Sequence, residues 1–442
     1  MLQRGAYRLF NAFSSFQHRA LRRLTPAGRL VVAVLIGAVI MGPNTRLTVA
    51  YQAVTFLLAL LALALACALR APARLQIRRV LPRFGTAGEP ATYRLVATNA
   101  GGRTQRGLSV LEDLEDPRPS FEDFVSTPEP GEERRNWFDR KVGYPRWAWL
   151  EDLNRRAEIG EQPLAPIAPG GTVEAPVTFT PRRRGAVRFR GATLARTDPF
   201  GLVRALTRVE APASLLVLPR RHRLPPLALP GSRRYQPGGM TLASSVGDSE
   251  EFVSLREYRP GDPLRHIHWR SWARAGKPIV KEFQDEFFVR HGLVLDTFQT
   301  VADGERFEDA VSVAASFAAS LETQESLLDL MFVGTEAYCF TAGRGVGHAD
   351  RMLEILACVR PCRDRPFAAL HGLVVERQAA LSGCIVVLLA WDDDRRRLVA
   401  ALRGLGVPTL VLLVAGPGEP HPAEPDVHRL EVGRVAEGLA RL

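Results

Sequence analysis

Two long uncharged apolar stretches near the N-terminus constrain the fold of this chain most strongly. Residues 30–45 and 47–69 contain no charged side chain, and a single arginine, Arg46, separates them. The second stretch exceeds the ~20 apolar residues that a helix needs to cross a bilayer. A first helix over 24–41 can also span if Arg29 extends towards the lipid headgroups. With the turn-forming sequence Gly-Pro-Asn-Thr between them, these stretches predict a two-helix transmembrane hairpin over residues 24–70.

The distribution of charge orients this hairpin. The net charge of the chain is +11, but the first 88 residues contain 12 Arg and no Lys, Asp or Glu, so the remaining 354 residues carry a net charge of −1. Arginines flank both outer ends of the hairpin, which places both ends in the cytoplasm by the positive-inside rule. Residues 1–23 are then a basic cytoplasmic N-terminus. The near-neutral remainder argues against a uniformly basic protein that coats nucleic acid.

Short alternating strands follow over residues 75–219. Segments 91–99, 172–180, 186–190 and 214–218 have strand patterns bounded by turn residues, and Pro176 in the second suggests an edge strand. This spacing without helical periods predicts an immunoglobulin-like β-sandwich. Residues 112–170 interrupt it as an insertion that contains three of the six tryptophans. We expect the insertion to pack on the sandwich rather than to lie on the bilayer surface.

A Pro- and Gly-rich linker over residues 220–249 leads into a motif at 250–283 that is dense in charged and aromatic side chains. Pro260 to Pro263 predicts a turn, and 277–283 a strand. The candidate interaction residues are Arg256, Glu257, Tyr258, Asp262, Arg265, His266, His268, Trp269 and Arg274.

Three interpretations of this motif remain open. The favoured one is a network of ion pairs and hydrogen bonds that locks the motif and docks a protein partner. The second is a hydrolase, with or without a metal, that uses His266, His268 and Asp262; the two histidines would share one face of a strand. The third is nucleic-acid binding through Arg and Trp side chains, which the interleaved acids oppose.

Residues 284–442 alternate apolar strand runs with helical segments. Strands at 291–295, 327–333, 337–340, 384–390 and 407–414 and helices at 307–323, 349–359, 366–378 and 393–404 predict a doubly wound, parallel α/β sheet. Asp296 and Asp392 each follow a strand, so both are expected at the carboxyl edge, where such sheets bind ligands.

The motif residues carry a family resemblance. Residues 254–262, 265–269 and 273–274, with Asp-Pro-Phe-Gly-Leu at 198–202 and Arg-Arg-Gly at 183–185, resemble the signature of the domain of unknown function 58 family. The resemblance covers most of the chain, while residues 112–170 depart from the compact β-domain of that family. It implies a bacterial, membrane-anchored protein with a terminal domain similar to von Willebrand factor A domains.

The same resemblance implies partners rather than a reaction. Such proteins are typically encoded beside MoxR-type AAA+ ATPases and often beside transglutaminase-like membrane proteins, which suggests an accessory role in assembling or activating a client. No nucleophile–base spacing and no phosphate loop is evident in the sequence. We therefore expect a non-enzymatic adaptor in the bacterial inner membrane that docks a MoxR-type ATPase and does not bind nucleic acid.

A von Willebrand-type Mg²⁺ site would need Asp-x-Ser-x-Ser after the first strand, a loop Thr and a late Asp, all oxygen ligands. Here the first loop reads Asp296-Thr297-Phe298-Gln299-Thr300, the second, 345–349, lacks a Thr, and Asp392 is the late Asp. Two of the expected ligands are missing, so Asp296, Thr300 and Asp392 are weak candidates and we expect no cofactor.

Overall fold

The computed structural model describes residues 2–41, 48–68, 74–225, 251–260, 262, 264, 267–284, 289–299, 304–320, 326–342, 346–420, 422 and 424–442. The chain divides into two compact units, Met1–Leu218 and Pro219–Leu442. Each is considered by itself below.

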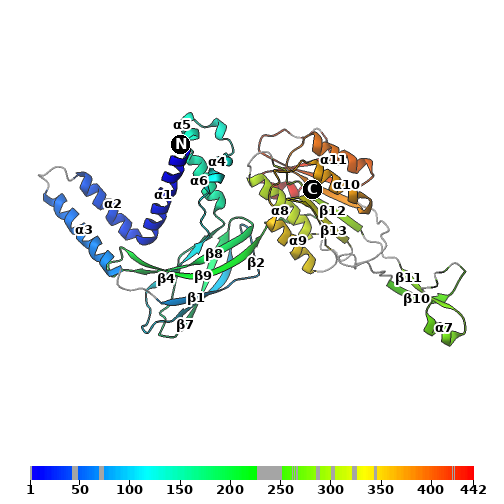
Figure 1. The fold of residues 1–442 in the computed structure, drawn as a ribbon, viewed down its shortest axis with the longest axis horizontal. Helices are drawn as coiled ribbons and strands as arrows, with labels where there is room; N and C mark the ends of the chain where they lie inside the picture. The colour runs from blue at the N-terminus through cyan, green and yellow to red at the C-terminus, as the bar shows by residue number, and fades with distance from the viewer. Residues whose placement is uncertain are drawn as a thin grey trace. The chain divides into compact units, whose positions relative to one another are not determined.

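Three helices begin the first unit (Figure 1): α1 (Leu2–Arg23), α2 (Pro26–Met41) and α3 (Thr48–Ala68). The sequence did not predict α1. Thr25 separates α1 from α2 and accepts a hydrogen bond from the backbone N–H of Gly28 at 3.0 Å, while its own hydroxyl donates to the carbonyl of Gly201 at 2.5 Å.

Among the described residues, α3 is the one helix long and apolar enough to cross a membrane. The 16 residues of α2 extend about 24 Å at 1.5 Å per residue, less than the roughly 30 Å of a bilayer core. The predicted first span at 24–41 is described as a helix from Pro26 to Met41, and Leu24 and Thr25 precede that helix. The predicted turn at 42–45 lies outside the described residues.

Two antiparallel-rich sheets form a β-sandwich, as predicted for 75–219. The order in the first sheet is β1-β3-β7-β5, and in the second β2-β9-β8-β4-β6. Their bounds are β1 Leu75–Val80, β2 Phe84–Thr86, β3 Ala91–Asn99, β4 Leu108–Leu114, β5 Ala157–Ile159, β6 Gln162–Pro163, β7 Thr172–Pro181, β8 Gly185–Thr197 and β9 Arg204–Leu218.

Alternate residues of both sheets fill the core between them, including Tyr93, Phe179 and Phe189. One ion pair is buried there: Arg79 Nε donates to Glu112 at 3.1 Å, and Tyr93 donates to the same carboxylate at 2.6 Å. A buried charge pair is tolerated when its remaining hydrogen bonds are satisfied. The Tyr93 and Arg79 side chains thus fix Glu112 at the centre of the sandwich.

The insertion is shorter than the predicted 112–170, because β4 runs to Leu114 and β5 begins at Ala157. Between them lie α4 (Phe121–Ser126), a 3-10 turn (Glu132–Arg134), α5 (Trp137–Val142) and α6 (Tyr144–Asn154). Phe124, Trp147 and Leu150 form a small core with Tyr7 and Phe10 of α1. Trp147 thus packs against α1, whereas the sequence led us to expect packing on the sandwich.

The second unit contains a six-stranded sheet of order β14-β13-β12-β15-β16-β17 (Figure 1). All neighbouring strands are parallel except β13 and β14. The fully parallel sheet that was predicted is wrong at this edge, because three residues join β13 to β14 and a parallel crossover needs a dozen or more. The strands are β12 Val289–Leu295, β13 Ser326–Val333, β14 Ala337–Ala342, β15 Gly383–Leu388, β16 Thr409–Ala415 and β17 Val427–Glu431.

Helices cover both faces of this sheet, as in a doubly wound fold. α8 and α9 pack together on one side, while α10 and α11 lie on the other, over the core that includes Val294, Val386 and Val411. The helices are α8 Gly304–Ser320, α9 Val346–Cys358, α10 Ala368–Arg377, α11 Asp393–Gly404 and α12 Val435–Leu439. The sequence did not predict β17 and α12.

Candidate functional site

The signature motif forms a β-hairpin with a short helix between its strands. β10 (Glu251–Glu257) pairs antiparallel with β11 (Ile279–Gln284), and α7 (Trp269–Ala275) lies in the connection. Two backbone hydrogen bonds hold the connection: Tyr258 N–H donates to the carbonyl of Pro278, just before β11, at 2.9 Å, and His268 N–H donates to that of Ile279 in β11 at 2.8 Å. The predicted strand at 277–283 is confirmed as β11.

One bidentate ion pair fixes the turn of the hairpin. Both terminal nitrogens of Arg256 donate to the two carboxylate oxygens of Asp262, each at 2.7 Å, and the backbone N–H of Arg259 donates to Asp262 at 2.8 Å. The hydrogen bonds from Arg256, followed by that from Arg259, lower the pKa of Asp262 to about 2. Asp262 is therefore ionised at neutral pH, and its carboxylate accepts the hydrogen bonds that close the turn.

Beside this turn, the hairpin exposes large apolar side chains. Trp269 is 65% exposed and Leu264 is 68% exposed. The ring of Trp269 stacks on that of Trp272, with centroids 5.2 Å apart and an interplanar angle of 19°. Ile267 and Val280, by contrast, are buried under the connection. The hairpin has a small apolar interior and a separate aromatic surface.

The structure places the other predicted motif residues around this surface. Glu257 forms an exposed ion pair with Lys277, Tyr258 is half-buried, and Arg274 is exposed on α7. Arg265 and His266 lie outside the described residues. Among the residues that the structure places, the motif thus contributes ion pairs at its base and aromatic rings at its surface.

The arrangement of His268 differs from the predicted shared strand face. It precedes α7, and its Nδ1 lies 2.7 Å from the hydroxyl of Ser271. The strand pattern fails because the helix begins directly after His268. In the described part of the chain no three His, Cys, Asp or Glu side chains are grouped as metal ligands.

At the carboxyl edge of the α/β sheet, the two predicted aspartates are brought together by an arginine. Asp296 follows β12 and is buried, while Asp392 caps α11 by accepting from the backbone N–H of Arg395 at 3.1 Å. The Arg395 guanidinium lies between them: Nε donates to Asp296 at 2.8 Å, and Nη1 donates to Asp392. At this sheet edge, the Arg395 guanidinium thus occupies the position between the two carboxylates.

The remaining contacts complete this buried cluster. Asp296 also accepts from the backbone N–H groups of Phe298 at 2.9 Å and Leu389 at 3.1 Å. Arg395 donates to the Phe298 carbonyl at 3.1 Å and lies 4.6 Å from the ring centroid of Phe367. Burial raises the pKa of Asp296, and the adjacent Arg395 charge opposes that rise.

This donor set does not fit a divalent cation. The guanidinium takes the carboxylate oxygens that a cation would need, and Phe298 presents an aromatic ring and a carbonyl already bonded to Arg395. Thr300, the third weak metal candidate, lies outside the described residues. The sequence analysis missed Arg395, although its position three residues after the helix-capping Asp392 is a usable signal.

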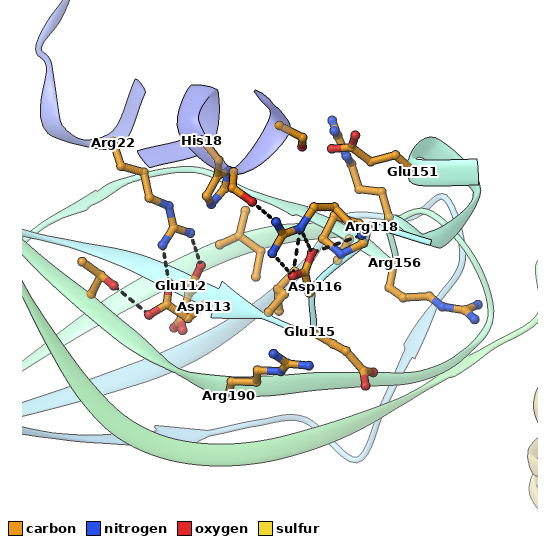
Figure 2. A pocket seen from close by; sticks show the side chains of 18 of the residues that line it. His18, Arg22, Glu112, Asp113, Glu115, Asp116, Arg118, Glu151, Arg156 and Arg190 are labelled. Atoms are coloured by element: carbon orange, nitrogen blue, oxygen red, sulfur yellow. Dashed lines mark hydrogen bonds and ion pairs between the residues drawn. The ribbon is translucent and has the colours of Figure 1, made fainter. Parts of the chain in front are cut away.

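A charged cavity of about 980 Å³ lies in the first unit, between α1, the end of β4 and α6 (Figure 2). Its polar groups are extensively paired across these elements. Arg22 forms an ion pair with Asp113, and Arg118 bonds both Asp116, at 2.8 Å, and the side-chain oxygen of Asn11, at 2.8 Å. These ion pairs and hydrogen bonds hold α1 against the sandwich and the segment that follows β4. No sequence motif predicted it.

The family called Protein of unknown function DUF58 matches residues 254–394 of this chain. That region begins in the signature hairpin and ends in the first turn of α11, so it includes the Arg256–Asp262 pair and both Asp296 and Asp392 and ends one residue before Arg395. This match supports the family resemblance that the signature residues indicated.

Among curated proteins, the chain is 27% identical over 211 residues to a protein named Uncharacterized protein YeaD from Bacillus subtilis (strain 168). The match covers 47% of this chain and 51% of the relative, so the chain spans about half the length of the curated relative it matches.

Solved structures match about a third of the chain at low scores. They include the CARDB domain of PF1109 from Pyrococcus furiosus, with a TM-score of 0.17, 13% identity, and coverage of 33% of this chain and 96% of that one. A Salmonella alpha-2-macroglobulin mutant has a TM-score of 0.19, 16% identity, and coverage of 37% and 8%. The β-sandwich assignment rests on the two sheets of this chain rather than on these similarities.

Proposed function

We propose that this protein is a membrane-anchored adaptor whose signature hairpin docks a protein partner, a MoxR-type AAA+ ATPase, during assembly or activation of a client. The observation that carries the proposal is the exposed Trp269–Trp272 stack with Leu264 on a hairpin closed by the Arg256–Asp262 pair. The choice of ATPase comes from the family resemblance.

The physical basis is the way protein interfaces concentrate binding energy. Exposed tryptophan is enriched among the few residues that dominate interface affinity. A rigid presenting element reduces the entropy lost on binding. Here the bidentate pair at the turn and the hydrogen bonds from the connection to β11 hold Trp269 in place before a partner arrives.

In this proposal the α/β domain is a scaffold similar to von Willebrand factor A domains that needs no bound cation. Arg395 forms ion pairs with both Asp296 and Asp392 at the sheet edge where such domains bind Mg²⁺. The carboxyl edge is thus stabilised internally, and recognition is assigned to the hairpin.

The anchor completes the proposal. α3 is the candidate span, and the shorter apolar helix α2, which packs against α3, is taken as the second crossing of a hairpin. The first 88 residues contain arginines and no acidic side chain. By the positive-inside rule, both termini and the two folded units face the cytoplasm of a bacterial inner membrane.

Affinity capture from detergent-solubilised membranes tests the proposal. The full chain is expected to retain an AAA+ ATPase of the MoxR type, and the Trp269→Ala variant to lose most of it. Trp137→Ala is the matched control, because Trp137 is also 65% exposed but lies in the first unit. Equal capture by all three proteins, or capture of no such ATPase by the wild type, would refute the docking role of the hairpin.

A further inference from the structure

Helix α1 leaves a stripe of large apolar side chains exposed, while Asn11, Ser15 and Arg22 form hydrogen bonds with the rest of the first unit. Leu9, Phe13 and Phe16 are 67%, 61% and 68% exposed. Their spacing of four and three residues places them on one helical face. A soluble surface helix normally has the opposite arrangement, with its apolar stripe towards the core.

The opposite face of α1 explains why the helix does not rotate to bury these residues. Ser15 and Asn11 accept from Arg118, and Arg22 pairs with Asp113 (Figure 2). Nearer the N-terminus, the Tyr7 ring lies 5.2 Å from that of Trp147. These contacts fix the rotation of α1 and leave the apolar face outward.

His18 belongs to the docked face as well. Figure 2 shows it directed into the charged cavity, and burial, followed by the nearby Arg22 charge, lowers its pKa. The other charged groups around it are Asp113, Asp116 and Arg118.

The surroundings of the apolar face indicate what covers it. Arg8, Arg19 and Arg23 are exposed on the same helix, and the first 88 residues contain no acidic side chain. Two residues, Leu24 and Thr25, connect α1 to α2, which packs against the candidate span α3. An apolar face flanked by arginines beside a membrane-spanning segment has the composition of a helix that lies in a bilayer interface.

We propose that α1 lies in the plane of an anionic bilayer, with Leu9, Phe13 and Phe16 inserted at the boundary between headgroups and acyl chains and its arginines among the lipid phosphates. The polar face then holds the β-sandwich and its insertion at the membrane surface. This inference concerns a lipid contact and is independent of the partner-docking role of the hairpin.

Photocrosslinking of the full chain in lipid nanodiscs tests the proposal. A benzophenone amino acid replaces Phe13 or Phe16, and the matched control carries it at Leu264, which is equally exposed on the hairpin. The nanodiscs contain phosphatidylcholine alone or with phosphatidylglycerol. We expect lipid adducts at positions 13 and 16 at least fivefold above those at 264, with higher yield when phosphatidylglycerol is present.

A second variant tests the role of the apolar face. Phe16→Asp, combined with the photoreactive group at position 13, is expected to reduce the lipid adduct severalfold, while Gln17→Asp is not. Crosslinks from positions 13 and 16 to a second copy or to another part of the chain would overturn the proposal. So would lipid adducts no higher than at 264.

Discussion

Two of the Arg–Asp pairs in the second unit lie in very different surroundings. Arg395 and Asp296 are buried at the edge of the α/β sheet, where backbone groups and Asp392 satisfy their remaining hydrogen bonds. Arg256 and Asp262 form an equally close pair at the turn of a hairpin near solvent. The geometry of the two pairs is similar, but their burial differs.

Burial determines what each pair can do. A buried pair is costly to break because removing one partner leaves an uncompensated charge in a region that excludes water. A partly exposed pair such as Arg256–Asp262 costs less to break, since water can solvate both groups when they separate. We infer that the Arg395 pair stabilises the sheet edge, whereas the Arg256 pair serves the shape of a surface that binds a partner.

Removing Arg395 should have the largest effect. Arg395→Ala leaves Asp296 without its cation and is expected to destabilise the α/β domain by about 3–5 kcal/mol. Hydrogen exchange of the β12 and β15 amides in the full chain measures this loss. Arg396→Ala is the control on the same helix, because Arg396 is half exposed and pairs with Asp393, and its effect should stay within about 0.5 kcal/mol. Equal effects of the two variants would contradict the distinction.

Removing the exposed ring should affect binding rather than stability. Trp269→Ala is expected to weaken binding of the ATPase by about 2 kcal/mol, the threshold for a dominant interface residue, or roughly 30-fold in Kd. Interferometry with the purified ATPase measures the change, and exchange of the β12 amides should remain as in the wild type. A loss of protection in β12 would instead assign Trp269 a structural role.

Acidification should open the hairpin turn only at pH values below the ordinary pKa of an aspartate, because Asp262 is protonated late. Because the folded-state pKa of Asp262 is depressed from 3.8 to about 2, the stability that Asp262 contributes is present above pH 3.8 and is lost as the pH falls towards 2. Exchange of the Arg259 amide, corrected for its intrinsic rate, should rise in that window. In Arg256→Gln the rise should move up towards pH 3.8; an unchanged profile would show that Arg256 does not set this pKa.

Added Mg²⁺ should have the smallest effect. Since Arg395 occupies the carboxylates of Asp296 and Asp392, millimolar Mg²⁺ is expected to leave the thermal unfolding of the wild-type chain unchanged. A clear rise in Tm that depends on Asp296 would indicate a bound cation and contradict the fit of the guanidinium.

The sheets and the ion-pair clusters also differ in how well the sequence predicted them. The apolar run at 384–390 predicts a central strand because strands buried on both faces need continuous apolar residues, and β15 confirms it. The alternation at 91–99 predicts β3 for the equivalent reason in a sandwich. Local patterns of this kind determined most of the sheets.

Features that depend on distant residues were not predictable in this way. Arg395 meets Asp296 across 99 positions, and no periodicity reports such a pair. Helix α1 was not predicted, because its arginines were interpreted as marking the cytoplasmic side of a membrane hairpin. The residues that fix the helix, Asn11, Ser15 and Arg22, bond to side chains beyond residue 110. At the motif, the sequence indicated the residues but not the helix after His268.

Hydrogen exchange of the full chain with and without the purified MoxR-type ATPase tests the central claim most directly. The proposed docking role predicts that the ATPase slows exchange in the described hairpin residues, 251–260 and 267–284, more than anywhere else. Trp269→Ala should abolish that protection, and Trp137→Ala should retain it. Protection confined to the β-sandwich or the sheet edge, or no protection at saturating ATPase, would contradict the claim that the hairpin docks this partner.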